Sequence, residues 1–147
     1  MQRALRIILV GGVIVGLLAM PGMAMAGIKI KAIYFDPPGS DTGSNSHLNK
    51  EYVVIKNTGN DGRQLRRWKL FDKGRIHTYK FGRFKLRAGR SVKVHTGRGT
   101  DTRFHVYWGM GNYVWNNDGD RATLKTKGGR TVSRCSYSST ASSPKRC

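Results

Sequence analysis

The sequence predicts an all-β sandwich preceded by an N-terminal signal peptide. Two observations predict the sandwich. After residue 26 no segment shows sustained helical periodicity, and short stretches that alternate apolar and polar side chains recur, separated by Gly, Asn and Asp. Such stretches form strands with one buried and one solvated face, and the buried faces of two sheets can then share one core.

The N-terminal segment has the three-part layout of a secretory signal peptide. Two arginines precede an uncharged apolar stretch, and Ala24-Met25-Ala26 follows with the small-x-small spacing that signal peptidase requires. We therefore expect cleavage after Ala26 and secretion of the protein. The alternative is an uncleaved membrane anchor, because residues 7–26 are just long enough to span a bilayer. Pro21-Gly22 argues against the anchor, since it ends the apolar helix early.

The strands of the sandwich are predicted in chain order by their side chains. Residues 28–35 begin by alternating Ile and Lys, and residues 51–57 are rich in β-branched side chains. Residues 64–72 place Trp68 and Leu70 on one side of a strand, with cations on the other. Five further stretches complete the set, namely residues 77–81, 91–96, 104–108, 121–126 and 131–137.

The segments between the strands carry turn residues. Residues 57–62 and 126–129 contain the Gly and Asn that positive φ angles favour. The one long polar loop covers residues 35–49. We expect the folded domain to occupy residues 27–137, and the Ser-rich tail, residues 138–147, to be disordered apart from its terminal cysteine.

The two cysteines, Cys135 and Cys147, permit one disulfide in an exported chain. It would tie the C-terminus to the last strand and stabilise the fold by about 3 kcal/mol. The sequence has neither a CxxC redox pair nor a zinc-binding cluster of cysteines.

The charge of the mature chain points to a polyanionic partner. Residues 27–147 hold 27 − 2 = 25 Lys and Arg against 8 Asp and Glu, a formal charge of +17. Only one of the acids is a glutamate, Glu51. Such an imbalance opposes compactness and favours binding to polyanions or anionic surfaces, whereas solubility alone is the alternative explanation.

Four stretches of the sequence together form a recognisable pattern, and they read NKEYVVIKNTG, LRRWKLFDKGRIHTYKF, LRAGRSVKVHTGRGTD and YWGMGNYVWNNDGDRATL. This pattern resembles the lamin tail domain of secreted bacterial proteins, and the resemblance covers about Ile28 to Tyr137. It implies an immunoglobulin-like β-sandwich, in agreement with the alternation described above. It also implies a binding module rather than an enzyme and leaves the ligand open.

The chain departs from that family at outward positions of its strands. Cations stand where relatives of this type usually carry polar or acidic residues, so the fold is kept and the surface is changed. If the strands share a sheet, these cations form one patch; otherwise the charge is spread over the whole surface. The seven candidate polyanion-binding residues are Arg66, Arg67, Lys69, Lys80, Arg83, Lys85 and Arg87.

The stretch around Asn116-Asn117-Asp118 raises the question of a calcium loop. An EF-hand alignment that puts Gly119 at its invariant glycine places Val114 and Lys125 where oxygen ligands are needed. Two essential ligands are therefore missing. We predict instead that a strand ends at Val114-Trp115, that residues 116–119 form a turn, and that a second strand returns.

No pattern in the sequence predicts a catalytic, metal or cofactor site. The four histidines have no metal-binding spacing, although His95 and His105 lie on different predicted strands and could meet. The expected partner is a nucleic acid, such as DNA, or an anionic cell-wall polymer. The alternatives are a protein-interaction or envelope-structural domain and a small secreted nuclease. Oligomeric state is left open.

Overall fold

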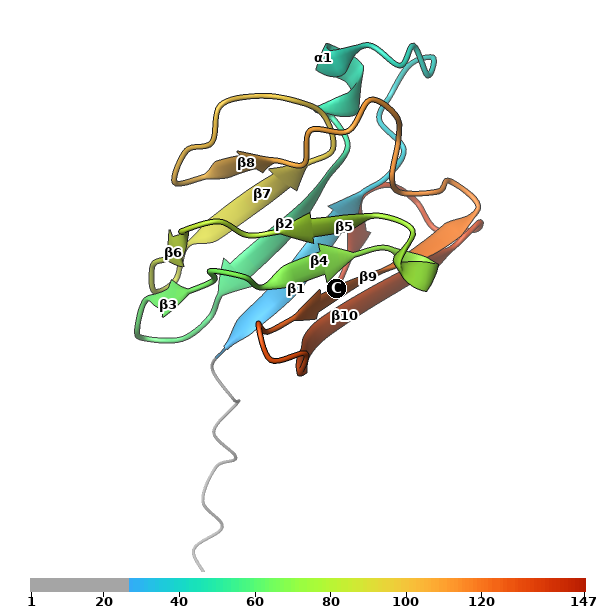
Figure 1. Ribbon diagram of the computed structural model, residues 1–147. Helices are drawn as coiled ribbons and strands as arrows, with labels where there is room; N and C mark the ends of the chain where they lie inside the picture. Colours follow the sequence, from blue (N-terminus) through green and yellow to red (C-terminus); the bar gives the residue numbers. More distant parts are fainter. Residues whose placement is uncertain (1–26) are drawn as a thin grey trace, which may run out of the picture.

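Two sheets stacked face to face, with mostly antiparallel strands, form the sandwich in the computed structural model, which describes residues 27–147 (Figure 1). One sheet has the order β11 (Lys145–Arg146), β1 (Ile28–Tyr34), β2 (Tyr52–Asn57), β7 (Ser91–His95) and β8 (His105–Tyr107). The other has the order β10 (Thr131–Ser138), β9 (Gly119–Lys125), β4 (Lys69–Phe71) and β5 (Thr78–Lys80). A separate ribbon pairs β3 (Arg63–Gln64) with β6 (Lys85–Leu86). Among the paired strands of residues 27–147, β7 and β8 alone run parallel.

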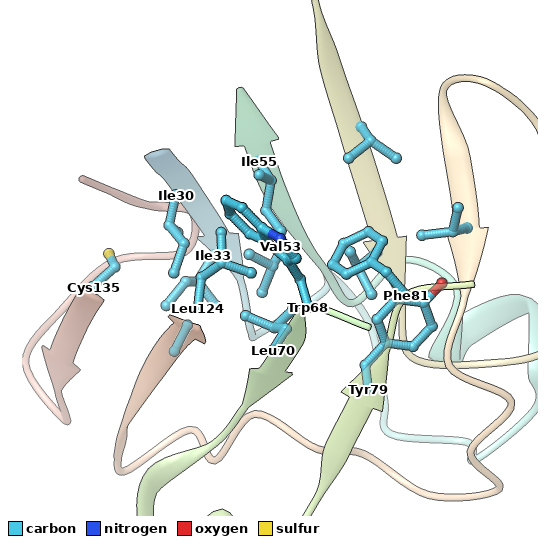
Figure 2. Packing of buried hydrophobic residues seen from close by; sticks show 14 of the residues in the cluster. Ile30, Ile33, Val53, Ile55, Trp68, Leu70, Tyr79, Phe81, Leu124 and Cys135 are labelled. Carbon is cyan, nitrogen blue, oxygen red and sulfur yellow. The ribbon is translucent and has the colours of Figure 1, made fainter. Parts of the chain in front are cut away.

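The core lies between the two sheets, as the alternation predicted (Figure 2). Ile33, Val53 and Ile55 face inward from the five-stranded sheet and are fully buried. Leu70 and Leu124 meet them from the four-stranded sheet. Each such side chain stabilises the fold by about 1.5–3 kcal/mol relative to an exposed position, so burial of these rows fixes the register of the sheets. The all-β sandwich is confirmed.

The prediction of one continuous strand over residues 64–72 is wrong. The chain turns at Arg66-Arg67, and the amide of Trp68 donates to the carbonyl of Leu65 at 2.8 Å. This turn lets Leu65 and Trp68 both reach the core, which an unbroken strand would not allow because they are three residues apart. Two short helices were also not predicted, α1 (Asn45–Leu48) within the long polar loop and η1 (Lys73–Arg75) after β4.

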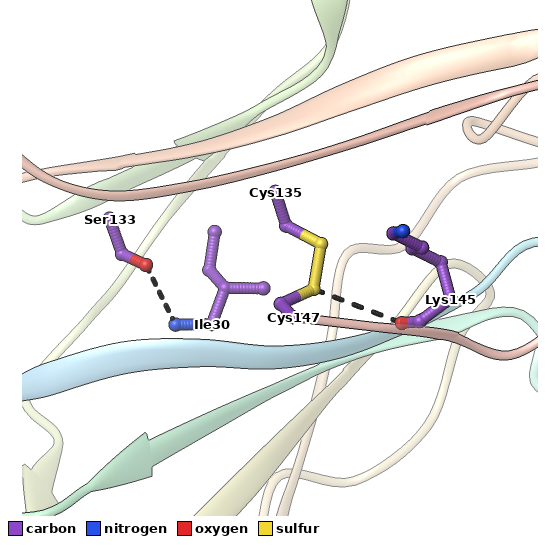
Figure 3. The surroundings of a disulfide bond; sticks show 5 residues. All are labelled: Ile30, Ser133, Cys135, Lys145 and Cys147. Carbon is purple, nitrogen blue, oxygen red and sulfur yellow. Dashed lines mark hydrogen bonds between the residues drawn. A yellow bond between two sulfur atoms is a disulfide. The ribbon is translucent and has the colours of Figure 1, made fainter.

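The C-terminal tail is ordered, so the expectation of a disordered tail is wrong. Lys145 and Arg146 form β11 on the edge of β1, and the Cys147 amide donates to the Lys31 carbonyl at 3.0 Å. The predicted disulfide is present and joins Cys147 to Cys135 of β10 (Figure 3). Because β10 belongs to the other sheet, the disulfide links the two sheets.

The turn predicted at residues 116–119 is confirmed, but the strand expected before it is absent. Val114 and Trp115 are buried in an irregular segment between β8 and β9. The Gly119 amide donates to the Asn116 carbonyl at 3.2 Å, and Gly119 has a φ of +126°. Asp120 is buried, and its Oδ2 accepts hydrogen bonds from the amide of Asn116 at 3.3 Å and from Asn116 Nδ2 at 3.2 Å, so its carboxylate supports the turn.

The predicted signal peptide, residues 1–26, lies outside the described residues. Within residues 27–147, no helix is long and apolar enough to cross a membrane.

Candidate polyanion-binding surfaces

The cations of the domain have no acidic partners. Across residues 27–147 the structure contains a single ion pair, between His77 Nδ1 and Asp72 Oδ2 at 2.7 Å, and none that involves Lys or Arg. Three acids, Glu51, Asp72 and Asp120, are buried and accept hydrogen bonds from the protein itself. The positive charge on the surface is therefore left uncompensated and is available to an external anion.

A row of three lysines crosses the outer face of the four-stranded sheet. Lys69 of β4 lies opposite Lys80 of β5 on one side and opposite Lys125 of β9 on the other. Neighbouring strands are about 4.8 Å apart, so the three ammonium groups project from adjacent positions. Like charges directly opposite one another destabilise a sheet, and a bound anion would remove that cost.

Phe71 organises the cations at the centre of this face. Its side chain is only 7% exposed although it lies on the outer face of β4. The Arg75 guanidinium lies 5.3 Å from the ring centroid, and the Lys125 ammonium lies 5.6 Å from it. Two cation–π contacts therefore hold these cations beside Lys69.

The row of three lysines continues into a groove that has two parts. Lys69, Phe71, Arg75 and Lys125 line one part, which adjoins a second part through the shared residues Thr126 and Lys127. No acidic residue lines either part. We call the whole surface the basic groove; its nine cations are Arg63, Arg66, Arg67, Lys69, Arg75, Lys80, Lys125, Lys127 and Arg130.

Two arginines of the basic groove have unusual backbone conformations. Arg67 has a φ of +65° and Arg75 a φ of +63°, and they are the only residues other than glycine with positive φ in the described part of the chain. An L-residue in this region costs about 1–2 kcal/mol. The two residues flank β4, one at each end, and both side chains line the groove. Strain of this kind concentrates at functional sites.

The seven candidate cations do not all lie on one surface, because the other three lie outside the basic groove. Arg83, Lys85 and Arg87 alternate with inward-facing neighbours as predicted, and all three are exposed. They line two adjoining hollows together with Arg90 and Arg103. These hollows share no lining residue with the basic groove, so the seven predicted cations divide between two surfaces.

Sequence reasoning missed five cations of the basic groove. Lys125 follows the buried Leu124, so alternation indicates that the Lys125 side chain faces outward. Alternation does not show that Lys125 lies opposite Lys69 across the sheet. The remaining four belong to turns or short ribbons, where alternation gives no direction. The five missed residues are Arg63, Arg75, Lys125, Lys127 and Arg130.

Glu51 is the most perturbed acid, and its contacts explain it structurally. Burial raises its pKa from 4.5 to about 7. Its carboxyl group accepts hydrogen bonds from Thr96 Oγ1 at 2.6 Å, from the Val114 amide at 2.8 Å and from the Trp115 amide at 3.4 Å. The side chain is wholly buried and fastens the irregular segment before β9 to the end of β7.

The two histidines that could meet do so on the outer face of the five-stranded sheet. His95 Nε2 lies 2.8 Å from His105 Nδ1, and His95 Nδ1 lies 2.7 Å from the Asn49 carbonyl oxygen. Since that carbonyl can only accept, His95 Nδ1 carries a proton, while burial lowers the pKa of the ring and favours its neutral form. Residues 27–147 hold no group of three or more His, Cys, Asp or Glu side chains placed to bind a metal ion.

A comparison with protein families agrees with the observed fold. A family model described as Lamin Tail Domain matches residues 21–139, a range that includes both cationic surfaces. No curated protein matches the chain.

Proposed function

The chain belongs to the lamin tail domain family, and from this we propose that it is a secreted, non-catalytic binding module that engages an extracellular polyanion through the basic groove. The observation that supports the proposal most is the groove itself. Nine cations from β3, β4, η1, β5, β9 and two turns lie along one continuous surface that no carboxylate lines. Domains of this family serve as interaction modules, and this one offers charge as its means of interaction.

A linear polyanion suits the shape of the basic groove. The row Lys80, Lys69 and Lys125 runs across the strands, and the groove then extends past Lys127 to Arg130. Contacts of this kind neutralise phosphates and release counterions, so the affinity depends steeply on salt. Nothing in the groove resembles a helix that could enter a DNA groove and read bases, and we expect weak sequence preference.

The test is the salt dependence of binding to duplex DNA and to a teichoic-acid-like polymer. If about five phosphates are neutralised, the log–log slope on duplex DNA is about −4 to −5. Changing Lys69, Lys80 and Lys127 together to Thr should flatten this slope by up to about 2.7, because three contacts are lost. All three side chains are exposed, so the fold should survive.

The matched control changes Lys29, Lys31 and Lys50 to Thr, which removes the same charge from two strand positions and one loop position outside the groove. Equal flattening in both triple variants would show diffuse attraction without a site. Absence of binding to either polymer near physiological salt would contradict the proposal. If the protein cleaves the DNA and EDTA suppresses this cleavage, the result would instead support a secreted nuclease.

A further inference from the structure

A second cationic surface, separate from the basic groove, surrounds an exposed aromatic ring. Four cations, Lys85, Arg87, Arg90 and Arg103, line a hollow together with Phe104 and the buried Leu86. We call this surface the basic hollow. Its residues come from β6, from the turn that follows, and from the loop before β8. No acidic residue lines it.

A tight turn brings two of these cations together. The Arg90 amide donates to the Arg87 carbonyl at 3.2 Å, and Gly89 has a φ of +68°, as the third residue of a type II turn requires. The Asn57 amide donates in turn to the Arg90 carbonyl at 2.9 Å, which fastens the turn to the end of β2. The two arginines are therefore held at one end of the hollow by backbone geometry.

The exposed ring of Phe104 is also held in place. Its side chain is 43% exposed, one of only two large apolar side chains so exposed among residues 27–147. The Thr102 hydroxyl accepts hydrogen bonds from the amides of Phe104 and His105 at 3.2 and 3.1 Å, and the Phe104 carbonyl accepts one from Lys93 at 2.8 Å. The ring is thus presented to solvent by an ordered loop and not by a loose one.

The neighbour of this ring is a cation. The Arg103 guanidinium lies 4.9 Å from the Phe104 ring centroid, and Phe104 still has 43% of its surface exposed to solvent. A fixed aromatic ring beside several cations is the arrangement with which proteins hold unpaired nucleotides, since a base stacks on the ring while cations hold the backbone.

We propose that the basic hollow binds one unpaired nucleotide of a single-stranded nucleic acid. Lys85, Arg87 and Arg90 hold the phosphate, and the base stacks on the open part of the Phe104 ring. The hollow has a volume of about 150 Å³, below the roughly 300–1,000 Å³ of sites that enclose a small molecule. It accordingly takes the phosphate and leaves the base on the ring at its rim.

This inference concerns a site of its own and does not rest on polyanion binding by the basic groove. It does separate the candidate polyanions, because a wall polymer of polyol phosphate offers phosphate without a base. Duplex DNA also fits poorly, since its bases are already stacked on one another.

The experiment measures binding of adenosine 5′-monophosphate and of ribose 5-phosphate to the full chain at low salt by calorimetry. We expect the nucleotide to bind about 5- to 100-fold more tightly than the sugar phosphate, which is the worth of one stacked base. Phe104→Leu should remove most of that difference and leave sugar phosphate binding unchanged. Replacing Arg87 and Arg90 together by Gln should weaken both ligands.

The control is the variant with Lys29, Lys31 and Lys50 changed to Thr. These lysines lie outside both cationic surfaces, so the variant should bind the nucleotide as the unchanged protein does. Equal affinity for the two ligands would overturn the inference, and so would a Phe104→Leu effect of the same size on both. Failure to bind the nucleotide at millimolar concentration would overturn it too. None of these results would affect the salt slope on duplex DNA, so the two proposals can fail separately.

Discussion

Glu51 shows how a single residue can make the stability of this domain depend on pH. Its pKa is 4.5 in the unfolded chain and about 7 in the folded protein, so between these values the folded state binds the proton more tightly. The contribution of Glu51 to the free energy of unfolding is therefore fully present below about pH 4.5 and is lost as the pH rises through about 7. The ionised carboxylate then remains buried, supported only by its three hydrogen bonds.

Replacing Glu51 by Gln removes this titration and keeps an acceptor for Thr96 and Val114. We expect the free energy of unfolding of the variant, relative to the unchanged protein, to rise by about 3 kcal/mol between about pH 4.5 and pH 8, because 2.5 pKa units are involved. Urea unfolding at several pH values measures it. Parallel pH profiles of the two proteins would show that Glu51 does not titrate in this range.

Arg67 gives a second prediction at the scale of a single residue. Because its φ is positive, replacing Arg67 should weaken polyanion binding without lowering the stability of the fold. Arg67→Gly relieves the strained conformation and should leave the free energy of unfolding unchanged or raise it by up to about 1 kcal/mol. The same change should weaken polyanion binding, since the side chain lines the basic groove.

The control for this prediction is Arg66→Gly. It removes the same charge from the same groove at a residue that does not have a positive φ, so it should destabilise the fold slightly. Denaturant unfolding of the two variants in parallel decides the matter, and greater destabilisation by Arg67→Gly would contradict the interpretation of strain.

At the scale of elements, the C-terminal strand depends on the disulfide. β11 contributes only two residues to the edge of β1, and such a short pairing is weak by itself. Replacing Cys147 by Ser, together with Cys135 by Ser, should lower the free energy of unfolding by about 3 kcal/mol. The amide of Cys147, which donates to Lys31, should then lose its protection from hydrogen exchange.

Peptide mapping without reduction supplies the control, since it must show Cys135 linked to Cys147 in the unchanged protein. A double variant that retains both its stability and this protection would show that β11 holds without the covalent link. Free thiols at Cys135 and Cys147 in the unchanged protein would contradict the disulfide itself.

The elements with regular alternation were predictable from sequence, and those that depend on distant pairing were not. β1, β2 and β7 bury alternate residues over most of their length, so a period of two reveals them. The two-residue strands β3, β6 and β11 are too short to show any period. The turn at Arg66-Arg67 was missed because the alternation of Trp68, Lys69 and Leu70 was extended back to residue 64. The spacing of three residues between Leu65 and Trp68 breaks the period of two and was the signal of the turn.

At the scale of the whole molecule, the sequence indicated that cations face outward but not which of them become neighbours. Lys80, Lys69 and Lys125 are adjacent only because β5, β4 and β9 pair in that order and register. Lys85 belongs to the separate β3–β6 ribbon, and Arg83, Lys85 and Arg87 line other hollows. A one-residue slip in any pairing would redistribute the charge, which explains why the surface could not be predicted.

Secretion, as proposed, requires that the N-terminal segment be removed during export. Signal peptidase should cleave after Ala26, so N-terminal sequencing of material from the culture medium should begin at Gly27. A matched variant with Ala24 and Ala26 changed to bulky residues should remain uncleaved and associated with the membrane. A native product that keeps Met1 and sediments with membranes would contradict secretion.

The charge of the domain also makes its stability depend on salt and on its ligand. With +17 on residues 27–147 and no Lys or Arg in an ion pair there, the folded state is destabilised by self-repulsion. Raising the ionic strength from about 0.01 to 0.15 M shortens the screening length from about 30 to 8 Å. We therefore expect the thermal midpoint to rise with salt over this range.

A polyanion that occupies the basic groove should have the same effect at low salt, since a ligand bound only by the folded state stabilises it. The variant with Lys69, Lys80 and Lys127 changed to Thr starts with less repulsion, so its midpoint at low salt should lie above that of the unchanged protein. It should gain less from salt and from the polyanion. The Lys29, Lys31 and Lys50 control carries the same net charge, so equal behaviour of the two variants would locate the repulsion in the molecule as a whole rather than in the groove.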